Sequence, residues 1–214
     1  MNPEQLLESG LKQLGFDPDD VQKEQFHRYL REVEFWNPTH SLVNAQGADL
    51  VVRHLLDCAS GGPLLRSELG SSAVVADVGS GAGLPGIPLA ILMPGDSFVL
   101  IERSARRAGF LRNVVAACRL VNTTVCEQQV EHVEERFDGI IFRAFHPLTP
   151  ELLDVLRRIL NPDGLIAAYK GSRLRTAGEI ERLPDDMKAE LVPLSVPGLD
   201  EERHMLLLRF EPAR

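Results

Sequence analysis

The chain has 214 residues, enough for one substantial hydrophobic core with a small appendage. Hydrophobic residues make up 44% and charged residues 25% of the sequence, which is typical of a soluble globular protein. No apolar run approaches the roughly 20 residues that span a bilayer, and the acidic first residues lack the basic segment of a signal peptide. The net charge of −8 repels nucleic acid at long range, so any contact with RNA requires a local basic face.

The cysteines and histidines carry no metal or disulfide pattern. Cys58, Cys118 and Cys126 form no CxxC pair, and an odd number of cysteines argues against a disulfide framework. The six histidines show no HExxH or other paired metal spacing. We therefore expect a cytoplasmic protein with reduced thiols, no metal and no membrane association.

Residues 1–70 show helical periodicity and no convincing strand, which predicts a helical N-terminal extension. The spacing of apolar residues predicts one helix over 17–35, ended by Asn37-Pro38. It predicts another over 48–59, ended by Gly61-Gly62-Pro63.

Residues 71–214 alternate between strand and helix patterns and are expected to form the second domain. Helices are predicted up to about residue 93, over 104–119 and over 152–160. The predicted strands cover 73–78, 98–102, 122–126, 137–142, 164–169, 188–193 and 203–210. Such alternation predicts a doubly wound α/β fold with a mostly parallel, seven-stranded sheet, in which the last two strands are antiparallel.

A glycine-rich turn follows the first predicted strand. The sequence there is Asp77-Val78-Gly79-Ser80-Gly81-Ala82-Gly83-Leu84, a GxGxG pattern that lets the backbone turn tightly and approach a ligand. Open α/β sheets bind ligands at such turns, at the carboxyl edge. A dinucleotide-binding loop reads GxGxxG and would place its third glycine where Leu84 stands. The pattern alone also fits an ordinary strand-to-helix turn.

Glu102 ends the second predicted strand at the same edge of the sheet. A carboxylate in that position can accept hydrogen bonds from both hydroxyls of an adenosine ribose. Its combination with Asp77 and the glycines at 79, 81 and 83 predicts a site for S-adenosylmethionine. An NAD-binding protein stays an alternative at this point.

Several further motifs closely resemble the GidB family, bacterial methyltransferases that modify N7 of a guanine in 16S ribosomal RNA. The resemblance extends from about residue 20 to residue 210 and is carried by DVGSGAGLPGIPLAI (77–91), Arg53-His54-Leu55-Leu56-Asp57, Arg143-Ala144-Phe145, Lys170-Gly171 and LDEERHMLLLRF (199–210). It implies the class I methyltransferase fold, S-adenosylmethionine as cofactor, and 16S rRNA or the small ribosomal subunit as partner. We further expect a monomer.

The resemblance also implies roles for single residues. The cofactor contacts of the family fall on Gly79, Leu84, Val130, Glu131 and Arg143. Arg143 and Lys170 are the candidates for orienting the substrate. No acid or base is assigned, because guanine N7 carries a free lone pair and has no proton to lose.

The distribution of charge makes RNA a plausible substrate. The segment from Arg103 to Arg119 contains five arginines and no acid, a local charge of +5 within a chain of −8. A second basic cluster follows the fifth predicted strand. The RNA-binding candidates are Arg103, Arg106, Arg107, Arg112, Lys170, Arg173 and Arg175. These side chains would also suit a merely solvated surface, as in a methyltransferase that acts on a small molecule or a protein.

Overall fold

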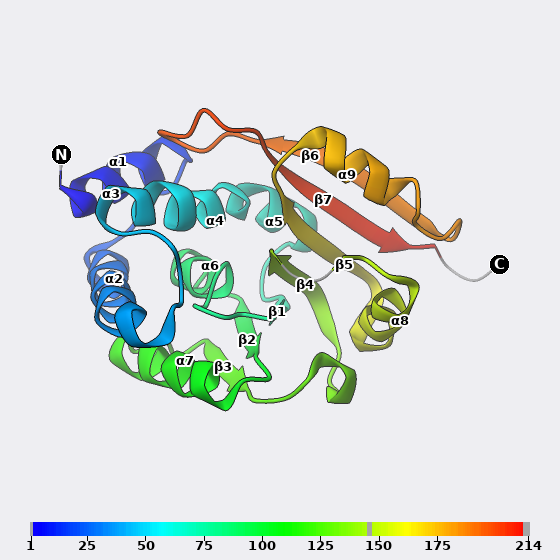
Figure 1. Ribbon diagram of the computed structural model, residues 1–214, viewed down its shortest axis with the longest axis horizontal. Coiled ribbons are helices and arrows are strands. Elements are labelled where there is room, and N and C mark those ends of the chain that lie inside the picture. Colours follow the sequence, from blue (N-terminus) through cyan, green and yellow to red (C-terminus); the bar gives the residue numbers. More distant parts are fainter. Residues whose placement is uncertain (1, 145–146, 212–214) are drawn as a thin grey trace.

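The computed structural model describes residues 2–144 and 147–211 and contains a seven-stranded sheet (Figure 1). The strand order is β3-β2-β1-β4-β5-β7-β6. The strands are β1 (Val74–Val78), β2 (Ser97–Ile101), β3 (Thr123–Cys126), β4 (Phe137–Arg143), β5 (Leu160–Lys170), β6 (Met187–Leu194) and β7 (Arg203–Phe210).

The first five strands pair in parallel, whereas β7 pairs antiparallel with both β5 and β6. The mostly parallel seven-stranded sheet that the sequence predicts is therefore confirmed. The usual dinucleotide-binding fold has the strand order 3-2-1-4-5-6. The antiparallel β7 inserted between β5 and β6 distinguishes this sheet from that fold.

Helices cover the sheet and precede it in the chain. They are α1 (Pro3–Gln13), α2 (Asp20–His40), α3 (Gly47–Leu50), the π-helix η1 (Val51–Leu56), α4 (Asp57–Ser60), α5 (Gly62–Leu69), α6 (Gly86–Leu92), α7 (Ala105–Ala117), the 3₁₀-helix η2 (Val130–His132), α8 (Pro150–Ile159) and α9 (Arg173–Ile180). None of the helices in the described ranges is long and apolar enough to cross a bilayer.

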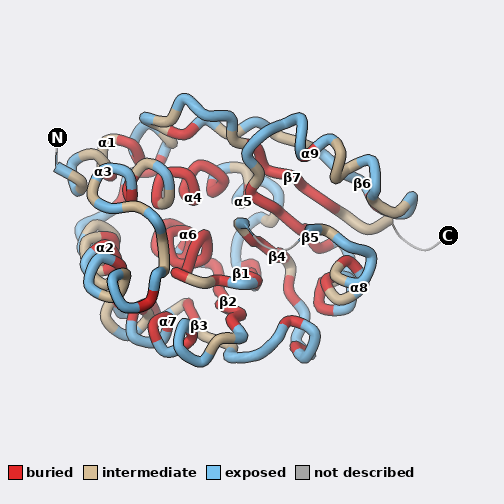
Figure 2. The backbone as a smooth tube through the Cα atoms, in the orientation of Figure 1, coloured by how far each residue is buried: buried red, intermediate tan, exposed pale blue. Residues whose placement is uncertain are grey.

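Two hydrophobic clusters lie on the two faces of the sheet, because successive residues of a strand point to opposite faces. In β5, Leu165 and Ala167 belong to the larger cluster with α1–α7, whereas Ile166 and Ala168 pack with α8. Figure 2 shows the buried stretches running along the central strands. The fold thus buries the strands on both sides and leaves their carboxyl edge for a ligand.

The N-terminal helices share the larger hydrophobic cluster with the sheet. Leu7, Phe26 and Leu55 belong to the same buried cluster as Met205 of β7. The Tyr29 hydroxyl donates to the Ala82 carbonyl oxygen at 2.8 Å, so α2 is tied to the glycine turn. The division into 1–70 and 71–214 stays a prediction, and the helical part is packed against the sheet.

The structure corrects the ends of the first predicted helix. Helix α2 starts at Asp20, because the Asp19 side chain caps it by accepting from the Gln22 N–H at 2.8 Å. It continues through Pro38 to His40, although Asn37-Pro38 was expected to end it. The Asn37 amide exchanges two hydrogen bonds of 2.9 Å with the Val43 backbone and holds the chain leaving the helix. Pro38 has no backbone N–H to donate to the Glu34 carbonyl oxygen, so the last turn of α2 has one hydrogen bond fewer.

The structure differs from the sequence predictions at three further places. Gly61-Gly62-Pro63 does not end the helical region, since Gly61 keeps helical torsion angles and α5 begins at Gly62. Helix α9 was missed because it has only one buried residue, Thr176, and so lacks an apolar stripe. Strand β5 begins at Leu160, earlier than expected, with a register irregularity opposite Phe137–Gly139.

Candidate active site

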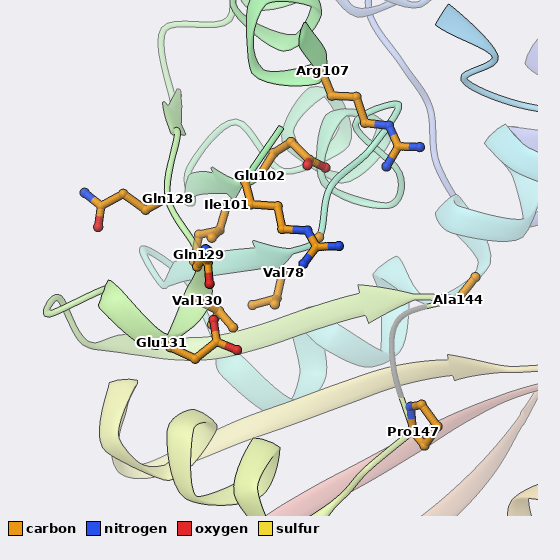
Figure 3. A pocket seen from close by; sticks show the side chains of 12 residues that line it. Val78, Ile101, Glu102, Arg107, Gln128, Gln129, Val130, Glu131, Ala144 and Pro147 are labelled. Atoms are coloured by element: carbon orange, nitrogen blue, oxygen red, sulfur yellow. The ribbon is translucent and has the colours of Figure 1, made fainter. Parts of the chain in front are cut away.

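A pocket of about 430 Å³ opens at the carboxyl edge of the sheet. It is lined by Val78, Gly79, Ile101, Glu102, Arg103, Arg107, Gln128, Gln129, Val130, Glu131, Ala144 and Pro147. These residues lie at or after the carboxyl ends of β1, β2, β3 and β4, as expected for a ligand site in an open α/β sheet. Figure 3 shows Gln128–Glu131 on one side of the cavity and Ala144 and Pro147 on the other. The volume suits a ligand of nucleoside size.

The glycine turn forms one wall of this pocket. The backbone N–H groups of Gly79 and Ser80 both donate to the Ile101 carbonyl oxygen, at 2.9 and 3.2 Å. Gly79, Gly81 and Gly83 all have positive φ angles, which residues with a Cβ rarely adopt. At Gly83 a Cβ would also lie 2.5 Å from the Ile87 side chain. The turn therefore needs glycine for its backbone shape and for its packing against α6.

Glu102 is held rigidly beside the turn. Its carboxylate accepts from the Gly81 N–H at 3.0 Å and from the Ser104 N–H at 2.9 Å. Only 4% of the residue is exposed, yet it lines the pocket. A carboxylate has about four lone-pair sites, and two backbone bonds leave capacity for the hydroxyls of a ligand.

Asp77 lies behind the glycine turn and does not line the pocket. It is fully buried, and its Oδ2 accepts from the Gly86 N–H at 3.0 Å. Its Oδ1 has no hydrogen-bond partner among the described residues. Burial raises the pKa of the Asp77 carboxyl to about 7, against the opposing hydrogen bonds from Gly86 and Ser80. Asp77 therefore organises the turn and carries an unusual proton affinity beside the pocket.

The structure brings only part of the predicted cofactor set to the pocket. Four of them line it: Gly79, Glu102, Val130 and Glu131. Gly81 does not line the pocket, but its N–H donates to the Glu102 carboxylate, which does. The others lie outside its lining, namely Asp77, Gly83, Leu84 and Arg143. Leu84 is buried in the hydrophobic core.

Arg143 ends β4 and points toward the N-terminal helical region. Its Nη1 donates to the Arg53 carbonyl oxygen at 3.1 Å and to Asp57 Oδ2 at 2.9 Å. Its Nη2 lies 2.5 Å from His54 Nδ1. Burial, followed by the charge of Arg143, lowers the pKa of His54 to about 4, so the ring is neutral and Nδ1 accepts from Nη2. The guanidinium is therefore fixed by the three hydrogen bonds that it donates to one helical segment.

The basic residues in and just before α7 divide into two groups. Arg103 and Arg107 are exposed and line the pocket. Arg106 donates to the His40 carbonyl oxygen at 3.2 Å, at the end of α2, and Arg112 pairs with Glu127 at 2.7 Å. Two of the five arginines in the segment of +5 charge are thus engaged in contacts within the protein.

The second basic cluster lies beyond β5. Lys170 ends that strand and pairs with Glu179 of α9 at 2.5 Å. Arg173 and Arg175 are exposed on the first turn of α9. Phe145, which belongs to one of the family motifs, lies outside the described residues.

Sequence reasoning missed several residues of the pocket, among them Ile101, Gln128, Gln129 and Pro147. A usable signal was present, because each of these lies at or just after the end of a predicted strand. The described residues contain no group of three or more potential metal ligands.

Comparison with known proteins identifies the relatives of the chain. Residues 22–206 match the GidB family model, described as rRNA small subunit methyltransferase G. The ribosomal RNA small subunit methyltransferase G of Actinobacillus pleuropneumoniae serotype 5b is 35% identical over 207 residues, which cover 95% of this chain and 97% of the relative. That of Chromobacterium violaceum is 37% identical over 204 residues and covers 94% of both chains.

Solved structures of other methyltransferases share the fold. The ribosomal protein L11 methylase of Lactobacillus delbrueckii subsp. bulgaricus has a TM-score of 0.58 at 16% identity, covering 72% of this chain and 78% of its own. TYW2 of M. jannaschii, solved in complex with AdoMet, has a TM-score of 0.53 at 20% identity, covering 72% and 77%. At these identities the likeness establishes the class I methyltransferase fold.

Proposed function

Because the chain belongs to the GidB family of rRNA small subunit methyltransferases G, we propose that it transfers a methyl group from S-adenosylmethionine to N7 of a guanine in 16S rRNA. The observation that carries the cofactor assignment is the fixed Glu102 carboxylate beside the glycine turn in a pocket of about 430 Å³. The family relationship supports the choice of nucleic acid and base.

The residues of the pocket fit the parts of this cofactor. Glu102 offers lone pairs to the ribose hydroxyls, and Val130 with Ile101 offers an apolar surface for the adenine ring. Positive-φ glycines bring the backbone of the turn close to the methionine part. Asp77, whose Oδ1 has no hydrogen-bond partner within the described ranges, lies behind this turn.

The protein has little acid–base chemistry to perform. S-adenosylmethionine supplies, when bound, an electrophilic methyl group on a sulfonium whose charge is neutralised as the methyl leaves. Guanine N7 attacks with its own lone pair and loses no proton. The side chains therefore act by aligning the two reactants and by excluding water. Arg143 and Lys170 lie at the strand ends where the base would enter.

Arg103 and Arg107 are the best candidates for contacts with RNA phosphates. They are exposed at the pocket mouth, whereas Arg106 and Arg112 already have protein partners. Because the whole chain carries a charge of −8, affinity for RNA depends on such local contacts and falls steeply as salt rises.

The direct test is methyl incorporation into 16S rRNA and into small subunits from cells that lack this gene, followed by mapping of the modified base. We expect one N7-methylguanine. Arg103→Glu combined with Arg107→Glu should raise the KM for RNA at least tenfold, with S-adenosylmethionine affinity nearly unchanged. The control is Arg112→Glu, whose native charge is already paired with Glu127. Methyl transfer to a small molecule or protein, with no methyl incorporation into rRNA, would contradict the proposal.

A further inference from the structure

An ion-pair junction at the carboxyl edge of the sheet lies outside the pocket lining. Asp57 is only 3% exposed, and its two carboxylate oxygens contact two arginines from different strands. Arg143 of β4 lies 2.9 Å from Oδ2, and Arg203 of β7 lies 3.2 Å from Oδ1. Burial raises the pKa of Asp57, and the two guanidinium groups oppose this by favouring the carboxylate. One buried acid therefore joins a helix to two strand ends.

The segment that carries this acid has an unusual backbone. Arg53 and His54 belong to the π-helix η1, and Asp57 follows it directly. π-Helices are rare and occur frequently at functional sites. Here the Arg53 carbonyl oxygen, the His54 ring and the Asp57 carboxylate all contact the same guanidinium. The segment thus provides three acceptors for one side chain.

The Arg143 guanidinium retains donors for a ligand. It has five N–H groups, and the three bonds to Arg53, His54 and Asp57 use three of them. The described part of the chain offers no partner for the other two. About a fifth of the side chain is exposed, at 19%. A guanidinium that is held by three hydrogen bonds and has two further N–H groups available is preorganised to bind an acceptor.

We propose that Asp57 is a positioning residue for methyl transfer, which together with His54 holds the two open N–H groups of Arg143 toward the methyl-accepting base. This inference rests on the proposed function. Methylation at N7 places a positive charge on the base, and a bare guanidinium nearby would oppose it. The Asp57 carboxylate, 2.9 Å from Arg143, offsets that charge. Asp57 therefore fixes the orientation of the Arg143 guanidinium and reduces the net positive charge beside the base.

The test is a double-mutant cycle of Asp57→Asn and Arg143→Ala, measured as kcat on 16S rRNA or small subunits. We expect Asp57→Asn to lower kcat roughly 10- to 100-fold, while the KM for RNA and the affinity for S-adenosylhomocysteine change less than about threefold. In the Arg143→Ala background the same substitution should have no further effect, because Asp57 acts through that arginine.

The matched control is Glu68→Gln. Glu68 of α5 pairs with Arg209 at 2.6 Å and joins the helical region to the other end of β7. Glu68→Gln also removes the charge of a carboxylate that pairs with an arginine, at a more exposed place away from the carboxyl edge. If it lowers kcat as much as Asp57→Asn, or if the effects of Asp57→Asn and Arg143→Ala multiply independently, the positioning role is refuted.

A second pair of variants decides the question if Asp57→Asn does not fold. His54→Asn retains an oxygen acceptor close to the place of Nδ1, whereas His54→Leu removes it. We expect only the leucine variant to lower kcat, again with no effect in the Arg143→Ala background, and equal activity of both would refute the inference. A wild-type protein that methylates no rRNA would instead overturn the proposed function itself.

Discussion

The two sides of the candidate site are built in different ways. Most of the side assigned to adenosine, namely the glycine turn and Glu102, comes from two adjacent strands and 26 consecutive residues of the chain, Asp77 to Glu102, and Val130 after β3 completes it. The acceptor side joins Asp57, Arg143 and Arg203, which are distant in sequence and meet only through salt bridges of 2.9 and 3.2 Å. The first side depends on backbone shape, whereas the second depends on a network of charges.

The difference shows where each side is sensitive. Backbone N–H groups and glycines carry no titratable group of their own, so the adenosine side responds mainly to steric changes and to its buried acids. The acceptor side holds its arginine through a carboxylate and a neutral histidine. Substitutions of titratable groups should therefore affect the two sides differently, and each of the following substitutions tests one side.

The largest effect is expected at Asp77. Its folded pKa of about 7 lies above the ordinary value of 3.8, because burial disfavours the charged form. The folded state thus keeps a proton that the unfolded state has lost, and stability is full below about pH 3.8 and is lost as pH rises to about 7. Relative to Asp77→Asn, the wild type should lose on the order of 4 kcal/mol over this range. Urea unfolding across pH measures the difference, and parallel curves would contradict it.

A smaller effect is expected for Glu102→Ala. Losing hydrogen bonds from ribose hydroxyls to a carboxylate should weaken S-adenosylmethionine binding by about 1.5–3 kcal/mol, measured by calorimetry. Gln128→Ala is the comparison, because that exposed side chain lines the same pocket and is not among the predicted cofactor contacts, and it should change affinity by less than about 0.5 kcal/mol. Equal effects of both substitutions would show that Glu102 does not hold the ribose.

The smallest effect, of opposite sign in pH, is expected at His54. Its folded pKa of about 4 lies below the ordinary value of 6.5, so stability is full above about pH 6.5 and is lost as pH falls to about 4. Because the ring is partly exposed, the wild type should lose about 1–2 kcal/mol relative to His54→Asn. Thermal unfolding of both proteins between these pH values measures it. A constant difference would show that His54 does not stay neutral beside Arg143.

The pattern of residues along the chain was sufficient to predict the sheet and most of the adenosine side of the site. Continuous apolar runs located the central strands within a few residues, because a strand buried on both faces leaves an unambiguous pattern. Four residues that line the pocket, Gly79, Glu102, Val130 and Glu131, could be predicted because residues after parallel strands meet at one edge. The family resemblance supplied Val130 and Glu131, and spacing supplied Gly79 and Glu102.

The remaining features depend on how the folded elements pack against one another. The missed α9 and the passage of α2 through Pro38 depend on contacts and caps that short-range patterns do not contain. Sequence placed Asp77 among the cofactor contacts, whereas burial puts it behind the turn. A count of charges did not distinguish the arginines of α7 from one another. In the structure, Arg106 donates to the end of α2 and Arg112 pairs with Glu127. Partners that lie far apart in the chain meet only when the whole core has formed, and the junction around Asp57 is made entirely of such partners.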